Sequence, residues 1–278
     1  MPQTFTAACL QLTSRREVED NLPIIRDLAR RARADGADLI LTPENTGFMA
    51  MGRKNLMARA EAEDENRPLA ALRDLAAETG AWLLVGSLAV KLADDARVAN
   101  RSYLIDPAGT VVAWYDKIHM FDVDLDGGES YRESNSFRPG DRAVVADLPW
   151  GRLGMTVCYD LRFPQLYRAL AQAGAHFLAV PSAFTRQTGR AHWHTLLQAR
   201  AIETGCFVLA PAQCGDHEDG RQTFGHSLIV APWGEVLADG GEGVGIVRAE
   251  IDPARVAQAR GRIASLRHDR DFAPPASH

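Results

Sequence analysis

Hydrophobic and polar residues follow two different patterns along this chain. Short apolar runs, such as ADLILTPE (37–44) and RLGMTVC (152–158), are typical of buried strands. Between them, apolar residues recur every three or four positions, as from Glu19 to Ala34, which predicts amphipathic helices. The DPAG turn at 106–109 predicts a hairpin. The alternation of strands and helices favours an α/β fold.

The full set of predicted elements is too large for one simple doubly wound sheet. The predicted helices cover 19–34, 67–78, 163–173, 191–203 and 253–263. The predicted strands cover 4–12, 37–44, 81–91, 99–107, 110–117, 143–148, 152–158, 176–182, 206–213, 225–232, 234–239 and 243–251. We therefore expect two packed sheets with helices outside. Because no linker-like segment divides the chain, we expect one domain over 1–278, with a polar tail from about 265 at the surface or at an interface.

The composition of the chain argues against several classes of binding partner. The net charge of −5 and the scattered Lys and Arg residues argue against nucleic-acid binding. No apolar run approaches the ~18 residues that a membrane-spanning helix needs. The four cysteines form no CxxC pair, and the first residues lack the pattern of a secretory signal, so we expect a cytoplasmic protein without disulfides. Cys9, Cys206 and Cys214 are expected to be packing residues.

Three apolar runs end on residues with reactive side chains, namely Glu44, Lys117 and Cys158. In open α/β sheets, active sites lie beyond the carboxyl ends of strands. A thiol becomes a nucleophile when a base removes its proton, and an ammonium group stabilises a thiolate or an oxyanion. A glutamate shielded from water keeps a raised pKa that suits a general base. Taken singly, each residue is better explained by a structural role: packing for the Cys, solvation for the Lys and a turn for the Glu.

The stretch from Ile118 to Asp141 has little periodicity and is rich in Gly, Ser, Asp and Glu. A loop of this length within a compact domain is usually functional or disordered, and we expect it to be functional because it follows Lys117.

The segments LTPEN (41–45), YDKIHMFDVD (115–124) and GMTVCYDLRFPQ (154–165) resemble the three signature segments of the nitrilase superfamily, the carbon–nitrogen hydrolases with a Glu-Lys-Cys triad. The likeness spans essentially the whole chain. It implies a four-layer αββα sandwich of two packed mixed sheets with outer helices, which pairs into a homodimer or a larger homo-oligomer. It also implies roles for four residues: Glu44 as general base, Lys117 as oxyanion-stabilising lysine, Cys158 as nucleophile and Glu133 as a second glutamate that orients the lysine.

Two further segments, PSAFTRQTGRAHWHTLLQARAIETGCFVLAPAQCG (181–215) and FGHSLIVAPWGEVLA (224–238), resemble the Nit branch of that superfamily. The resemblance implies an amidase that acts on a small carboxylate-bearing amide, with deaminated glutathione as the first expectation. Omega-amidase activity on α-ketoglutaramate or α-ketosuccinamate and nitrilase activity are the alternatives. The segment GGESY (127–131) matches neither Nit subgroup closely.

Four residues are candidates for binding the substrate. The backbone N–H of Tyr159, at a turn, is a natural second oxyanion donor. Arg162 offers a cation for a substrate carboxylate, although a salt bridge with Asp160 explains it equally well. Phe184 and Thr185 are pocket residues through the resemblance alone. Arg186 is expected to be exposed.

Other functions remain open at this point. A Cys-His hydrolase could use His119 or His226 as its base, and a binding or scaffolding protein could keep the fold without chemistry. The HxH pair of His192 and His194 is a poor metal site on a helix, because positions i and i+2 do not share a face. We therefore predict neither a metal nor an organic cofactor.

Overall fold

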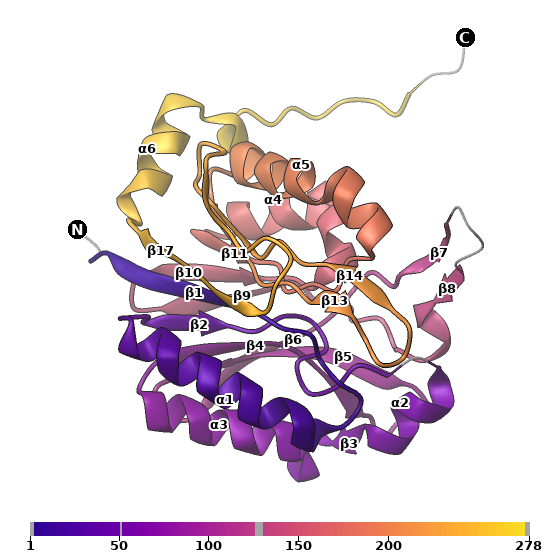
Figure 1. The fold of residues 1–278 in the computed structure, drawn as a ribbon. Coiled ribbons are helices and arrows are strands. Elements are labelled where there is room, and N and C mark those ends of the chain that lie inside the picture. The colour runs from indigo at the N-terminus through magenta and orange to yellow at the C-terminus, as the bar shows by residue number, and fades with distance from the viewer. Residues whose placement is uncertain (1–2, 51, 126–129, 276–278) are drawn as a thin grey trace.

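A computed structural model describes residues 3–50, 52–125 and 130–275. Within these residues, the strands form two large sheets that pack face to face (Figure 1). The seven-stranded sheet contains β17 (Gly245–Ile251), β1 (Phe5–Gln11), β2 (Leu39–Leu41), β4 (Trp82–Lys91), β5 (Val98–Ile105) and β6 (Val111–Asp116) in that order, with β3 (Glu61–Ala62) beside β4. The six-stranded sheet contains β16 (Val236–Asp239), β15 (Leu228–Val230), β12 (Phe207–Ala210), β11 (Phe177–Ala179), β10 (Gly151–Met155) and β9 (Val144–Leu148) in that order. Both sheets mix parallel and antiparallel pairs.

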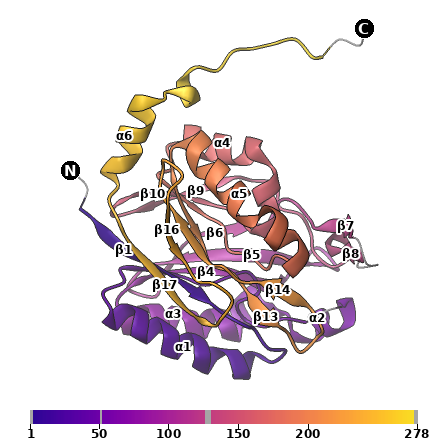
Figure 2. The ribbon, with the colours of Figure 1, turned by 45° about the horizontal axis from the view of Figure 1, so that its top comes forward.

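Helices cover the outer faces of both sheets. The helices are α1 (Val18–Ala34), α2 (Arg53–Arg59), α3 (Arg67–Thr79), α4 (Pro164–Gln172), α5 (Arg186–Thr204) and α6 (Ala254–Arg262). Figures 1 and 2 show α1 and α3 outside the first sheet and α4 and α5 outside the second. The predicted αββα sandwich is therefore confirmed. None of the helices in the described part of the chain is both long and apolar enough to cross a membrane.

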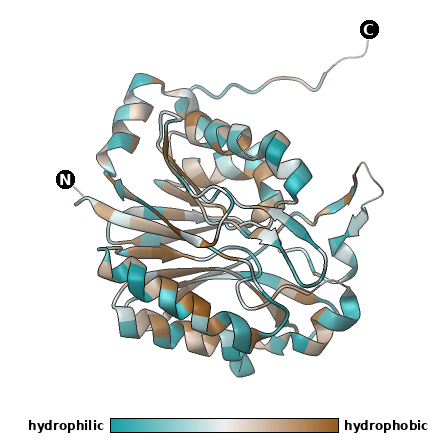
Figure 3. Cartoon of the chain, viewed as in Figure 1, coloured by the Kyte–Doolittle hydropathy of each residue, from teal (hydrophilic) through white to brown (hydrophobic). Residues whose placement is uncertain are grey.

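The largest core lies between the two sheets. It joins side chains of the first sheet, such as Leu41 and Leu84, to side chains of the second, such as Met155 and Phe177. A second core packs α1 and α3 against the first sheet. Figure 3 shows hydrophobic colour concentrated on the strands and hydrophilic colour along the outer helices, which is the pattern that a buried double sheet requires.

Several elements differ from the predicted ones at their ends. Helix α5 begins at Arg186 rather than near 191, because the Thr185 hydroxyl accepts a hydrogen bond from the Thr188 amide at 3.2 Å and caps the helix. Strand β10 ends at Met155 rather than at Cys158. Helix α2 and the small sheet of β13 (Cys214–Asp216) and β14 (Gln222–Phe224) were not predicted. Their apolar content is too low to produce a clear period.

The long segment after Lys117 is not entirely irregular. It contains the hairpin of β7 (Asp122–Asp124) and β8 (Ser130–Arg132), which Figure 1 shows at the edge of the molecule, followed by the 3₁₀ helix η2 (Glu133–Asn135). Most of the GGESY segment, residues 127–129, lies outside the described residues.

The described part of the C-terminal tail is exposed over residues 268–275. After the 3₁₀ helix η4 (Ser265–Arg267), residues 268–275 lead away from the body of the protein (Figure 1). The Phe272 side chain is exposed. Residues 276–278 of the predicted tail lie outside the described residues. A role of the tail at an interface stays a prediction.

Candidate active site

Glu44, Lys117 and Cys158 meet at one cavity of about 400 Å³. Glu44 and Lys117 follow β2 and β6 of the first sheet, and Cys158 follows β10 of the second, so both sheets contribute to the cluster. Their exposed fractions are 3%, 2% and 6%. Lys117 Nζ donates to Glu44 Oε1 at 2.9 Å, and the Cys158 thiol lies close enough to the same carboxylate for its charge to raise the pKa of the thiol. A base, a cation and a nucleophile therefore share one water-poor space.

Glu133 holds the lysine from the opposite side. Lys117 Nζ lies 2.8 Å from each Glu133 oxygen, and the Phe121 amide donates to Glu133 Oε2 at 2.6 Å. Asn100 Nδ2 donates to Glu44 Oε1 at 2.9 Å and to Glu133 Oε1 at 3.3 Å. The Lys117 ammonium group thus contacts the carboxylates of both Glu44 and Glu133, and the Asn100 side-chain amide donates to both as well. Sequence analysis missed Asn100, whose only signal is a polar residue inside the buried strand β5.

The backbone at Cys158 adopts a conformation that is uncommon for a residue with a side chain. Its φ is +51°, in the left-handed region, which costs about 1–2 kcal/mol for such residues. The turn is the 3₁₀ helix η3 (Cys158–Arg162), and the Cys158 amide donates to the Pro181 carbonyl at 2.9 Å. Asp160 is fully buried and accepts from the Val157 amide at 2.8 Å and the Tyr115 hydroxyl at 2.7 Å. These bonds hold the thiol at the cavity floor.

The charges of the cluster set its resting protonation. Burial alone would raise the pKa of Glu44, but the Lys117 and Arg221 charges and the hydrogen bonds to Cys158 and Lys117 hold that pKa below its usual 4.5. The expectation of a raised pKa is therefore wrong, since it considered shielding without the cations. Burial would lower the pKa of Lys117, but Glu133 and Glu44 raise it above its ordinary value. Burial and the Glu44 charge raise the pKa of Cys158. At neutral pH the pair is a carboxylate beside a thiol.

Tyr159 and Arg162 form part of the cavity wall just beyond Cys158. The Tyr159 ring lies edge-on to the Phe121 ring, with centroids 5.1 Å apart. The Arg162 guanidinium lies 5.3 Å from the Phe184 ring centroid, and its Nη1 is 3.3 Å from His192 Nδ1. Within the described ranges, no ion pair joins Arg162 to Asp160, whose carboxylate pairs with His119 instead. The salt-bridge explanation of Arg162 is therefore wrong.

Phe184 and Thr185 also line the cavity. The Phe184 ring packs against Trp193 with centroids 4.8 Å apart, which fixes its position. The Thr185 hydroxyl lies 2.8 Å from the Thr188 hydroxyl and caps α5, so its first role is local. Arg186 lies outside this wall, where it pairs with Asp216 at 3.0 Å and is partly exposed.

Arg221 is a cavity residue that sequence analysis missed. Its Nη2 donates to the Ala183 carbonyl at 2.8 Å, and the Ala183 amide donates to Glu44 Oε2 at 3.0 Å. Its Nε is buried and finds no hydrogen-bond partner within the described part of the chain. Such an atom costs free energy unless a ligand or water satisfies it. In the sequence, an arginine in the polar turn GRQ carries no signal of burial.

The histidines proposed as alternative bases lie elsewhere. His119 Nδ1 is 2.7 Å from Asp160 Oδ1, and its ring stacks on Phe163 at 3.5 Å. His226 Nδ1 is 2.9 Å from Asp239 Oδ1. Neither histidine lines the cavity that contains Cys158, whereas the Glu44 carboxylate does. The geometry therefore favours a glutamate-assisted thiol over a Cys-His pair.

Comparison with known proteins agrees with this geometry. The family model for carbon–nitrogen hydrolases matches residues 6–261. This chain belongs to the carbon–nitrogen hydrolase family. It is 42% identical over 267 residues to the deaminated glutathione amidase of Synechocystis sp. (strain PCC 6803 / GT-S), covering 95% of this chain and 97% of that protein.

Solved structures of this family have the same fold. The Caenorhabditis elegans NitFhit protein superimposes with a TM-score of 0.89 at 36% identity; the match covers 97% of this chain but 66% of that longer one. An amidase from Nesterenkonia sp. AN1 superimposes with a TM-score of 0.79 at 30% identity, covering 95% of each chain. In that amidase, a glutamate-to-glutamine mutant shows covalent addition of the acetamide moiety of fluoroacetamide at the active-site cysteine.

Proposed function

We propose that this carbon–nitrogen hydrolase is an amidase that cleaves the amide of a small carboxylate-bearing substrate through a thioester on Cys158. The observation that carries the proposal is that the buried side chains of Cys158, Glu44 and Lys117 line one cavity. The covalent chemistry at the cysteine of the Nesterenkonia amidase and the names of the curated relatives support it. Deaminated glutathione is the substrate that we propose first.

In the first half of the reaction, the Cys158 sulfur attacks the amide carbon while the Glu44 carboxylate accepts the thiol proton. Because the pKa of the thiol is raised, little free thiolate exists beforehand, and proton transfer accompanies attack. The carbonyl electron pair moves to the oxygen, where the Lys117 ammonium and the Tyr159 amide stabilise it. Glu133 keeps the ammonium in place and charged.

The oxyanion then collapses and the C–N bond breaks. Glu44 gives its proton to the departing nitrogen, so the amine leaves neutral and an acyl thioester remains on Cys158. In the second half, Glu44 takes a proton from water, the hydroxide oxygen attacks the thioester carbon, and the C–S bond breaks. The acid leaves, the proton returns to sulfur, and the resting carboxylate and thiol are restored.

Two of the arginines on the cavity wall favour a substrate with carboxylates. Arg162 and Arg221 both line the cavity, and the Arg221 Nε–H, which has no hydrogen-bond partner among the described residues, is suited to donate to a carboxylate oxygen of the substrate. Deaminated glutathione carries a keto-acid carboxylate at one end and a glycine carboxylate at the other, whereas α-ketoglutaramate carries only one. The cavity volume of about 400 Å³ falls within the usual range for small-molecule sites, about 300–1,000 Å³.

A substrate panel tests this proposal. We expect kcat/KM to be highest for deaminated glutathione, lower for α-ketoglutaramate and lowest for a neutral amide such as propionamide, with no ammonia released from nitriles. Higher kcat/KM for α-ketoglutaramate than for deaminated glutathione would favour an omega-amidase. Hydrolysis of nitriles would favour a nitrilase, and no turnover of any amide would contradict the proposal.

We further propose that the chain forms a homodimer or a larger homo-oligomer. Three exposed apolar side chains line one small pocket on the surface. They are Ile202 on α5, Trp233 in the loop before β16 and Ile263 just after α6. Apolar groups gathered in this way favour burial against a second chain. Light scattering of the purified protein would measure the mass, and a monomer at micromolar concentration would contradict this proposal.

A further inference from the structure

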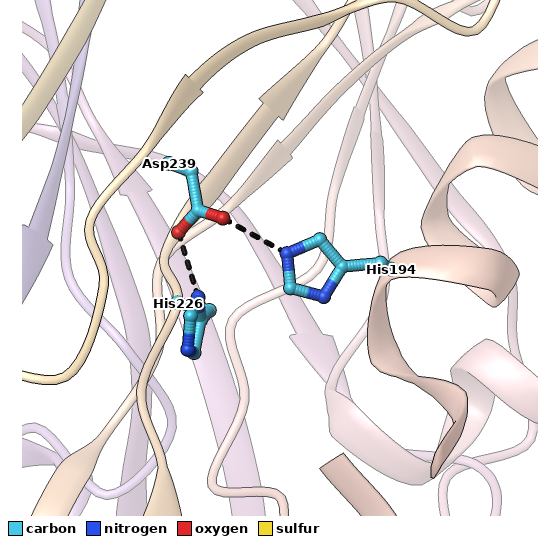
Figure 4. Close-up of side chains that lie close together, drawn as sticks. All are labelled: His194, His226 and Asp239. Atoms are coloured by element: carbon cyan, nitrogen blue, oxygen red, sulfur yellow. Dashed lines mark hydrogen bonds and ion pairs between the residues drawn. The ribbon is translucent and has the colours of Figure 1, made fainter. Parts of the chain in front are cut away.

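A second cluster of metal-binding side-chain types lies away from the cavity. His194 comes from the middle of α5, His226 from the loop before β15, and Asp239 from the end of β16 (Figure 4). His194 Nε2 lies 2.9 Å from Asp239 Oδ2, and His226 Nδ1 lies 2.9 Å from Asp239 Oδ1. One donor atom from each of the three residues lies within 4.8 Å of the other two. None of the three residues lines the cavity of Cys158.

Surrounding contacts hold His226 and Asp239 in place. The His226 ring stacks on the Phe224 ring with centroids 4.4 Å apart, and the His226 carbonyl accepts from Trp193 Nε1 at 2.8 Å. The His226 backbone is in the left-handed region, with φ at +55°. Asp239 Oδ1 also accepts from the Gly241 amide at 2.9 Å. The donors are therefore anchored on separate elements of the fold before any ligand arrives, which is what a metal site requires.

The spacing of the donors suits a tetrahedral ion. Zinc binds imidazole nitrogen and carboxylate oxygen at about 2.0–2.1 Å, which places tetrahedral donors about 3.3 Å apart. The two N···O separations of 2.9 Å run to different Asp239 oxygens, and one donor atom from each residue lies within 4.8 Å of the others, so side-chain movements of about an ångström would bring the three donors around one ion. The exposed fractions of the His194, His226 and Asp239 side chains are 34%, 22% and 35%. Water can therefore reach the ion and complete its coordination.

We propose that His194, His226 and Asp239 bind one divalent transition-metal ion, with zinc as the best fit. Two imidazoles and one carboxylate favour zinc over magnesium or calcium, which prefer sites made entirely of oxygen ligands. The ion would replace the two hydrogen bonds, and each imidazole would turn an unprotonated nitrogen toward it.

The position of the cluster suggests a structural role for the ion. It would join the middle of α5 to the β15–β16 pair, while the start of α5, at Thr188, lines the catalytic cavity. Because the three donors come together only in the folded chain, an ion bound there stabilises the native state. The adjacent HxH pair does not form the site, since His192 lies against Arg162 and the carboxylate comes from 45 residues further along the chain.

Calorimetric titration with zinc sulfate tests the proposal. The protein is first treated with a chelator and carries Cys158→Ala, because the active-site thiol could otherwise bind zinc. We expect one zinc ion per chain. His194→Ala and Asp239→Asn, in the same background, should each weaken this binding by roughly 100-fold or more, because even groups that only support metal ligands contribute about 10–100-fold.

The matched control is His192→Ala, which removes an exposed imidazole two residues away on the same helix and should leave zinc binding unchanged. Thermal melting without metal checks that each variant folds, and added zinc should raise Tm only in the parent and in His192→Ala. If His194→Ala does not fold, zinc binding by the isosteric variant Asp239→Asn decides whether the site exists. Absence of stoichiometric zinc binding, or zinc binding that survives the loss of the Asp239 carboxylate, would overturn the proposal.

Discussion

The catalytic cluster and the His194–His226–Asp239 cluster both combine nitrogen and oxygen groups, but their surroundings differ. Lys117 and Glu44 are almost completely buried, and the Lys117 ammonium group donates to the carboxylates of Glu44 and Glu133. The histidine cluster is partly open to solvent. Water and ions can therefore compensate a change in the second cluster, whereas in the first they cannot. We expect the carboxylate of the buried cluster to serve reactivity. We expect the carboxylate of the histidine cluster to join secondary-structure elements through a metal ion.

The largest expected effect is on turnover. Cys158→Ala removes the nucleophile and should lower kcat by at least about 10⁴-fold, since removing the nucleophile of a comparable covalent enzyme costs about 10⁶-fold. Steady-state amide hydrolysis measures the loss. Cys214→Ala is the matched control, because this second buried thiol, whose pKa burial also raises, does not line the cavity. Comparable losses in both variants would contradict a specific role for Cys158.

The next largest effect is on folding stability. It compares the cost of a substitution in the buried cluster with the cost of one in the partly exposed cluster. Lys117→Ala leaves the buried Glu44 carboxylate beside the partly buried Glu133 without their cation, and such a change costs about 3–5 kcal/mol of unfolding free energy. Asp239→Asn, in metal-free protein, breaks partly exposed contacts and should cost about 1 kcal/mol or less. Urea denaturation of both variants measures the difference. Equal losses would show that burial does not distinguish the clusters.

The pH dependence of activity gives a smaller effect that also identifies the base. Because the pKa of Glu44 is held below 4.5, the acidic limb of kcat/KM should fall below pH 4.5 rather than near the ~6.5 of a histidine. Folding stability should depend on pH in the same direction as activity and also fall at low pH. A carboxyl whose pKa is lower in the folded than in the unfolded state contributes stability above pH 4.5, which is lost as pH falls through the folded pKa. An acidic limb near pH 6.5 would favour a histidine base.

The smallest predicted effect concerns the cavity wall. Arg221→Lys keeps the positive charge but removes the Nε–H, for which the described residues offer no hydrogen-bond partner. KM for deaminated glutathione should rise roughly 10-fold or more, in line with about 1.5–3 kcal/mol for a charge-assisted hydrogen bond. KM for a neutral amide should change little. A uniform change across both substrates would indicate that Arg221 acts on Glu44 rather than on a substrate carboxylate.

Local sequence patterns were sufficient to identify the candidate site residues that follow strands. Glu44, Lys117 and Cys158 each follow an apolar run within a few positions, so the pattern identified them even where the strand ended earlier than predicted. The resemblance to a known family then supplied Glu133, which no local pattern distinguishes from other acidic residues of its loop. The αββα layers followed from the same resemblance and from the number of strands.

Contacts between distant segments could not be predicted in this way. Asn100 reaches Glu44 across 56 residues, and the Ala183 amide reaches it across 139. The direction of the Glu44 pKa shift depends on where Lys117 and Arg221 lie relative to that carboxylate, which spacing along the chain does not reveal. For the same reason, His194 could not be connected to Asp239 from the sequence.

Mass spectrometry of acid-quenched turnover tests the central claim most directly. With deaminated glutathione in excess, the peptide that contains Cys158 should gain the mass of the substrate's acyl group, and the Cys158→Ala protein should show no adduct. The peptides of Cys9, Cys206 and Cys214 should remain unmodified. An acyl group on another residue, or a burst of released amine that equals the enzyme concentration without an adduct on Cys158, would contradict the account.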